Sequence, residues 1–193
     1  MNLNFEEESK KEKKLQIIKE VIRWAVEIAI VIFIAFLLVY FFMLRTEMLG
    51  SSMENTLNNG QEVIVNKAAY LIFSPSRYDI IAFYQTDEEV DYLVTFRRII
   101  GLPGERVQIK EGTVYIDGEK LDEKYEMISM ESGGLAENEV VLGEDEYFVL
   151  GDNRNNSEDS RFRSFGNVAK DRIIGEAIFK MDPFALVRGP SIE

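Results

Sequence analysis

The 193-residue sequence predicts a mostly β fold, in which an N-terminal transmembrane helix precedes a domain built as an antiparallel β-sheet or barrel. Two observations carry this prediction. An unbroken apolar segment lies near the N-terminus, and seven short β-rich runs separated by turn residues follow it. The length suits one domain of ordinary size with an appendage, which excludes a multidomain assembly.

The apolar segment at residues 24–44 has the length of a membrane span, and its one charged residue is Glu27. A cleavable signal peptide is one alternative, but its apolar stretch is usually about 7 to 15 residues long and ends at small residues. No such small-residue site follows residue 44. A buried core helix is the other alternative, but a helix that is apolar on every face needs a larger domain around it. We therefore predict a transmembrane anchor over 24–44.

Charge on the two sides of the anchor predicts its orientation. Residues 1–23 contain six lysine and arginine residues, whereas the far side begins with Arg45 alone. The flank of a membrane span that is richer in lysine and arginine usually lies in the cytoplasm. We therefore expect a cytoplasmic arm over 1–23 and an extracytoplasmic domain over 45–193, in a single-pass protein of the cell membrane that contacts the lipid bilayer.

The composition excludes several classes of function. Residues 46–193 contain 28 acidic and 15 basic residues, a net charge of −13, which is the wrong sign for binding nucleic acid through its phosphates. The sequence contains neither cysteine nor histidine. A disulfide, a thiolate nucleophile, a histidine-based triad and the common zinc motifs are thereby excluded. We expect neither a metal site nor a cofactor.

The β-rich runs predict strands at 62–67, 79–84, 92–100, 106–110, 113–116, 146–151 and 172–180. Glu111-Gly112 and Asp117-Gly118 follow two successive runs and suit two-residue hairpin turns, because glycine tolerates positive φ. Residues 106–122 should thus form a three-stranded meander. We place this meander in a hairpin-rich insertion over 105–145.

Three polar clusters interrupt the predicted strands: LGSSMENTL at 49–57, FRRIIGLPGE at 96–105 and GDNRNNSEDSR at 151–161. Each alone is an ordinary loop pattern. In this order behind one anchor, they resemble the sequence boxes of the bacterial type I signal peptidases, of the single-anchor, Gram-positive-like kind. SSMENTL resembles the nucleophile box, and residues 78–83 and 98–104 resemble the second and third boxes. The resemblance extends from the anchor to Phe184.

The resemblance implies a membrane-bound serine endopeptidase that removes signal peptides from exported pre-proteins by means of a Ser-Lys dyad. It makes Ser52 the nucleophile, with the Ser52 amide as one oxyanion donor. It makes Ser157 the hydrogen-bonding partner of the dyad base. It also implies that Asp159 and Arg161 form an ion pair that braces the site, with Arg98 in the same support. For Asp152 we favour a structural role.

The position of the dyad lysine is occupied by Arg97. A guanidinium keeps its proton in proteins and is a poor general base. We expect Arg97 to donate a hydrogen bond to the Ser52 hydroxyl, with Ser157 also near that hydroxyl. A second class of function stays open: a catalytically impaired relative that acts as a chaperone or assembly factor for a surface protein such as a pilin.

The resemblance further implies a groove that binds an extended pre-protein segment as an added strand. The candidate walls of this groove are apolar, with core packing as the alternative for at least two of them: Met53, Leu57, Ile80, Ile81 and Phe83. The apolar run at 70–73 has two interpretations, contact with the membrane interface or a buried strand end.

Overall fold

The computed structural model describes residues 3–85, 93–123 and 129–187, and for residues 3–10 and 12 it describes the backbone alone. The chain divides into two compact units, Met1–Phe42 and Met43–Glu193. The first unit consists of one α-helix, α1, over Leu3–Phe42. Its part Lys13–Phe42 is long and apolar enough to cross a membrane.

The helix ends two residues before the predicted end of the anchor. Met43 and Leu44 belong instead to strand β1, Met43–Glu47, which pairs with strand β2, Glu62–Asn66. No local pattern predicts this change, because both residues continue the apolar run without a helix-breaking residue.

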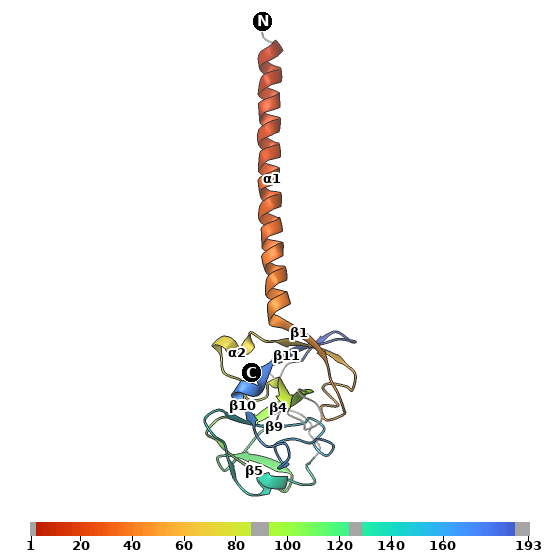
Figure 1. The fold of residues 1–193 in the computed structure, drawn as a ribbon, viewed down its shortest axis with the longest axis vertical. Helices are drawn as coiled ribbons and strands as arrows, with labels where there is room; N and C mark the ends of the chain where they lie inside the picture. Colours follow the sequence, from red (N-terminus) through yellow and green to blue (C-terminus); the bar gives the residue numbers. More distant parts are fainter. Residues whose placement is uncertain (1–2, 86–92, 124–128, 188–193) are drawn as a thin grey trace. The chain divides into compact units, whose positions relative to one another are not determined.

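The second unit is mostly β, which confirms the predicted fold class (Figure 1). Its larger sheet has the order β1-β2-β11-β3-β4-β9-β10, with β12 paired to β11, and all of its pairs are antiparallel. The remaining strands of this sheet are β3 (Ile80–Gln85), β4 (Leu93–Gly101), β9 (Glu146–Leu150), β10 (Val168–Ala169), β11 (Ile173–Lys180) and β12 (Ala185–Leu186).

The smaller sheet has the antiparallel order β7-β6-β5-β8. Its strands are β5 (Arg106–Lys110), β6 (Thr113–Ile116), β7 (Glu119–Lys120) and β8 (Val140–Val141). Strands β5, β6 and β7 form the predicted meander. Both of its turns have positive φ at their two central residues, Glu111 and Gly112 in one and Asp117 and Gly118 in the other. This is the backbone geometry of turns that match the twist of a hairpin.

Each of the seven predicted runs contains a strand, whereas β1, β8, β10 and β12 were not predicted. The last three are two residues long, too short to show an alternating pattern. Three short helical segments complete the unit: α2 (Ala69–Ile72), η1 (Gly134–Glu137) and η2 (Lys170–Arg172).

Gly101, at the end of β4, marks the place where the two sheets meet. A methyl group at this position would lie 2.5 Å from Val107 Cγ2 and 2.8 Å from Leu142 Cδ1, closer than packed atoms allow. One core cluster joins residues of both sheets, including Ile100 and Phe148 from the larger sheet and Val107 from the smaller one. The insertion is therefore packed against β4 and β9, the strands that lead into two of the polar clusters.

Candidate active site

Ser52 lies in a loop at residues 48–61, the serine loop, which is closed by backbone hydrogen bonds. The Met48 amide donates to the Gln61 carbonyl over 2.9 Å, and the Gly60 amide donates to the Met48 carbonyl over 2.7 Å. Gly50 has a φ of +83°, which glycine adopts without strain. Ser52 itself is buried. The serine is therefore held by the fold of its own loop.

A second loop at residues 151–161, the site loop, docks onto the serine loop. The Asn153 amide donates to the Ser52 carbonyl over 3.0 Å, and the Asn153 side chain donates to the Ser51 carbonyl over 3.1 Å. The Asn156 side chain donates to Ser51 Oγ over 2.8 Å. The structure thus brings together the first and third polar clusters, which lie about one hundred residues apart in the sequence.

Gly151 is the closest point between the two loops. A methyl group built on it would lie 2.2 Å from Ser157 Oγ and 2.5 Å from the Ser52 carbonyl oxygen. Both atoms therefore lie directly against the bare backbone of this glycine. The structure thus places Ser157 beside the main chain of Ser52, and the absence of a side chain at 151 sets their spacing.

Arg98 and Asp152 form a buried ion pair beneath the two loops. Arg98 Nε donates to Asp152 Oδ1 over 2.7 Å, and Arg98 Nη2 donates to Asp152 Oδ2 over 2.5 Å. The same carboxylate accepts a hydrogen bond from Thr56 of the serine loop. Each charge is thus matched in a two-pronged geometry. These contacts agree with the structural role that we favour for Asp152.

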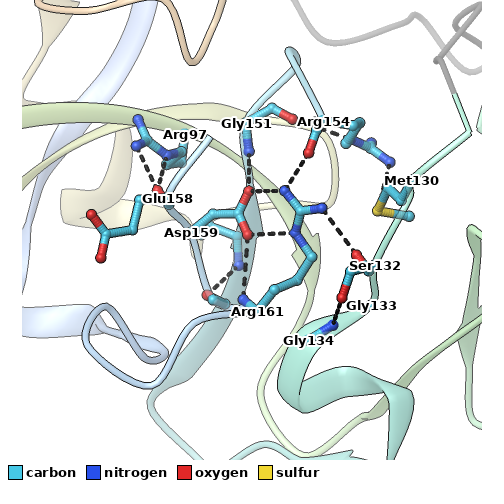
Figure 2. A network of polar contacts seen from close by, with 12 residues as sticks. Arg97, Met130, Ser132, Gly133, Gly134, Gly151, Arg154, Glu158, Asp159 and Arg161 are labelled. Carbon is cyan, nitrogen blue, oxygen red and sulfur yellow. Dashed lines mark hydrogen bonds and ion pairs between the residues drawn. The ribbon is translucent and has the colours of Figure 1, made fainter. Parts of the chain in front are cut away.

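The predicted ion pair between Asp159 and Arg161 is present (Figure 2). Arg161 Nε donates to Asp159 Oδ1 and Arg161 Nη2 donates to Asp159 Oδ2, each over 2.8 Å. Asp159 Oδ2 also accepts the Gly151 amide over 3.1 Å. Arg161 extends the network, because its Nη2 donates to the Arg154 carbonyl over 2.5 Å. This pair therefore fixes the backbone of the site loop at Gly151.

Arg97 does not donate to Ser52, which corrects our expectation. Its Nε and Nη2 donate to the Glu158 carbonyl over 3.0 and 2.6 Å, and its Nη1 donates to the Phe96 carbonyl over 2.6 Å (Figure 2). Its guanidinium also lies over the Phe165 ring, 5.3 Å from the ring centre. A buried guanidinium needs acceptors, and two peptide carbonyls offer better ones than a single hydroxyl.

Ser157 has lost the partner that the resemblance implies for it. Among the residues that the structure describes, its hydroxyl is the one buried side-chain oxygen or nitrogen without a hydrogen-bond partner. Arg97 binds the carbonyl of the very next residue, Glu158. An unsatisfied buried hydroxyl costs stability, and this one lies directly against the backbone of Gly151.

The surroundings of Arg97 disfavour a charge. Burial lowers the pKa of the Arg97 guanidinium from its ordinary value to about 10, and the nearby carboxylates of Asp159 and Glu158 offset this only in part. The direction is that of a basic group in a place poor in solvent. At neutral pH the group still carries its proton and is unable to accept one from serine.

The five candidate groove residues are core residues in this structure. Each is at most 1% exposed. Met53, Leu57 and Ile80 pack in one cluster, while Ile81 and Phe83 pack in another. A bound peptide would reach them only where the loops above them move apart, so their assignment as groove walls stays a prediction.

Arg154 and Glu123, to which we assigned no role from the sequence, form a partly buried ion pair. Arg154 Nη1 donates to Glu123 Oε2 over 3.0 Å, and Arg154 Nε donates to the Gly151 carbonyl over 3.1 Å. Figure 2 shows Arg154 also reaching Met130. These contacts tie the insertion to the site loop. No local pattern could reveal them, because the partners are 31 residues apart and belong to no shared motif.

Two arginine–carboxylate pairs thus support the loops around the serine. Comparison with known proteins shows the family of the chain. The family described as "Signal peptidase, peptidase S26" matches residues 21–181. The chain belongs to this signal peptidase family. The match covers the anchor, both loops and the insertion.

Curated signal peptidases align along nearly the whole chain. "Signal peptidase I T" of Bacillus subtilis (strain 168) is 35% identical over 97% of this chain and 96% of its own length. "Signal peptidase IB" of Staphylococcus aureus (strain COL) is 31% identical over 86% of this chain and 92% of its own length. A solved signal peptidase I from Enterococcus faecalis V583 is 34% identical, covers 54% of this chain and 97% of its own, and has a TM-score of 0.44. Together with the apolar helix α1, the family indicates a membrane-anchored protein.

Proposed function

We propose that this protein is a membrane-bound serine endopeptidase that removes signal peptides from exported pre-proteins, with Ser52 as its nucleophile. The observation that carries the proposal is the close approach of the Ser157 hydroxyl and the Ser52 main-chain carbonyl to the bare backbone of Gly151. Family membership supports the reaction class, and the docked loops supply a rigid support for the nucleophile.

The reaction would proceed in two steps. Ser52 Oγ attacks the carbonyl carbon of the scissile peptide, its proton passes to a base, and the carbonyl oxygen becomes an oxyanion facing the Ser52 amide. The carbon–nitrogen bond then breaks, and the leaving amine takes up the proton as the new N-terminus of the mature protein. Water hydrolyses the ester left on Ser52 and regenerates the hydroxyl.

The proton-transfer step is the weak point of this site. A neutral amine at position 97 would accept the serine proton, whereas the charged Arg97 binds the Glu158 carbonyl. General-base assistance is typically worth about 10²–10⁴ in rate. We therefore infer that the natural sequence cleaves slowly at neutral pH.

The test is cleavage of a model pre-protein by the purified full-length protein in lipid vesicles. The substrate carries small residues one and three positions before the cut, as the family prefers. We expect slow cleavage that disappears in Ser52→Ala and persists in Ser74→Ala, a matched control at an exposed serine. Cleavage that is equal in both variants would remove Ser52 as the nucleophile.

A second candidate function is favoured by the Arg97 geometry alone: binding of the pre-protein segment without turnover. It predicts equal peptide affinity for the natural sequence and Ser52→Ala, together with no cleavage over many hours. The pilin partner that we considered gains no support from the relatives, which are named as signal peptidases.

The topology belongs to the same proposal. We propose that residues 1–23 are cytoplasmic, that 24–44 span the membrane and that 45–193 lie outside. Protease added to sealed cells should then digest the second unit and spare the first 23 residues. Protection of the second unit would contradict this orientation.

A further inference from the structure

Tyr78 has a backbone conformation that is rare for a bulky side chain. Its φ is +75°, in the left-handed region that glycine adopts freely and that costs other residues free energy. Tyr78 immediately precedes strand β3. Strain of this kind persists only where the surroundings enforce it, and it is common at functional sites. The contacts of Tyr78 show what enforces the strain and what it achieves.

The surroundings fix Tyr78 at its ring, its hydroxyl and its main chain. Tyr78 is 7% exposed, and its ring packs in the core cluster that joins the two sheets. Its hydroxyl donates to the Asp122 carbonyl of the insertion over 3.0 Å. Its amide donates to the Ile99 carbonyl of β4 over 2.8 Å. These three attachments hold the backbone of Tyr78 in the left-handed region.

The strained backbone directs the Tyr78 carbonyl toward Arg98. Arg98 Nη1 donates to this carbonyl over 2.9 Å, while Nε and Nη2 of the same guanidinium bind Asp152. Arg98 is 1% exposed, and a buried donor that loses its acceptor costs stability. A rotation of the peptide after Tyr78 would therefore disturb the orientation of the guanidinium that holds Asp152.

A continuous path of polar contacts thereby connects the insertion with the serine loop. Hydrogen bonds and one ion pair join its members: Asp122, Tyr78, Arg98, Asp152 and Thr56. Thr56 belongs to the serine loop and lies four residues after Ser52. The position of the serine loop thus depends on the orientation of Arg98, which depends in turn on the Tyr78 carbonyl.

We propose that Tyr78 is a positioning residue of the peptidase site, whose left-handed backbone holds Arg98 in the orientation in which the Arg98–Asp152 pair fixes the serine loop. The effect on cleavage rests on the proposed function, whereas the effect on the serine loop does not. The proposal differs from a packing role in one respect. At position 78, a residue that adopts positive φ freely should preserve the serine loop better than a larger residue that resists this conformation.

The test compares Tyr78→Gly with Tyr78→Ala in the full-length protein in detergent micelles. Both variants lack the ring and the hydroxyl, but glycine keeps a positive φ without strain, whereas alanine has no side-chain anchor left to enforce it. Hydrogen exchange of the segment 48–61, followed by mass spectrometry, reports on the serine loop without any need for cleavage. The control pair is Glu111→Gly and Glu111→Ala, at an exposed turn residue of the smaller sheet whose φ is +49°.

We expect segment 48–61 to exchange at least about tenfold faster in Tyr78→Ala than in Tyr78→Gly, with no difference within the Glu111 pair. The kcat for pre-protein cleavage should fall by about 10² in Tyr78→Ala and by less in Tyr78→Gly, with little change in KM, because a misplacement of about 1 Å has that effect. Equal exchange in the two Tyr78 variants, or faster exchange in Tyr78→Gly, would overturn the proposal, because Tyr78 would then act by packing alone.

A second pair of variants covers the case in which neither of the first pair folds. Tyr78→Asn and Tyr78→Thr have side chains of similar size, but asparagine tolerates positive φ and a β-branched residue does not. Faster exchange of segment 48–61 in Tyr78→Thr supports the proposal, and equal exchange overturns it. If exchange follows the expected order while the natural sequence leaves the pre-protein uncut, the positioning role is supported and the proposed function fails.

Discussion

The two neighbouring arginines of β4 differ in how the fold treats their charge. Arg98, 1% exposed, meets the carboxylate of Asp152 with two of its nitrogens. Arg97, 6% exposed, donates to the backbone carbonyls of Glu158 and Phe96, and burial lowers its pKa to about 10. The Arg98 site thus matches its cation with a carboxylate, whereas the Arg97 site offers neutral carbonyl acceptors and its burial disfavours the charge.

The largest effect that separates the two sites should be on stability. Arg98→Met leaves Asp152 buried without its partner, and we expect a loss of about 3–5 kcal/mol in the free energy of unfolding. Arg97→Met also removes the penalty of a buried charge, so its cost should stay below about 2 kcal/mol. Urea unfolding of both variants measures the difference. Equal losses would show that the two arginines are equally structural.

The spacing of the site can be tested at Gly151. Gly151→Ala pushes a methyl group against Ser157 Oγ and the Ser52 carbonyl, and a misplacement of about 1 Å can cost about 10² in rate. We expect kcat to fall by that factor with little change in KM. Gly143→Ala is the control, because its methyl group would make ordinary contacts at 3.4 Å. Unchanged kcat in Gly151→Ala would separate Ser157 from the chemistry.

The smallest effect is a dependence of stability on pH. Because burial lowers the folded-state pKa of Arg97 to about 10, below its ordinary value, the folded chain binds fewer protons than the unfolded chain between the two values. Stability should therefore rise with pH in that window, by about 0.8 kcal/mol from pH 8 to 10.5. The same pH-dependent change in stability is measured for Arg97→Met and subtracted, which removes the contribution of the other titrating groups. A difference of the opposite sign would mean that the Arg97 site favours the charge.

The sequence predicted five of the eight strands of the larger sheet, β2, β3, β4, β9 and β11, because alternating apolar residues and turn residues are local signals. It also pointed to Ser52, Asp159 and Arg161, because whole boxes of residues resemble a known family. It could not predict where the Arg97 side chain points. That direction depends on the Glu158 carbonyl, 61 residues away. The pairing of Arg154 with Glu123 is likewise a long-range contact without a local pattern.

The chemical difference between Arg97 and lysine is the reason why the site is at once recognisable and unusual. Both side chains are basic, but the ammonium on its flexible stem loses a proton readily when buried, whereas the planar guanidinium keeps it. The Ser157 hydroxyl, for which the family resemblance implies a bond to the dyad lysine, is without a hydrogen-bond partner in the described part of the chain. An amine restored at position 97 should regain that partner and carry the serine proton.

The most direct test of this account is the rate of pre-protein cleavage by Arg97→Lys relative to the natural sequence. Both proteins are assayed at full length in vesicles at neutral pH, with Arg98→Lys as the matched control on the neighbouring residue. We predict that the cleavage rate rises by a factor of about 10²–10⁴ in Arg97→Lys and that adding Ser52→Ala abolishes this rise. The rate should not rise in Arg98→Lys. Robust cleavage by the natural sequence that Arg97→Lys leaves unchanged or reduces would contradict it, because an arginine site would then sustain the chemistry on its own.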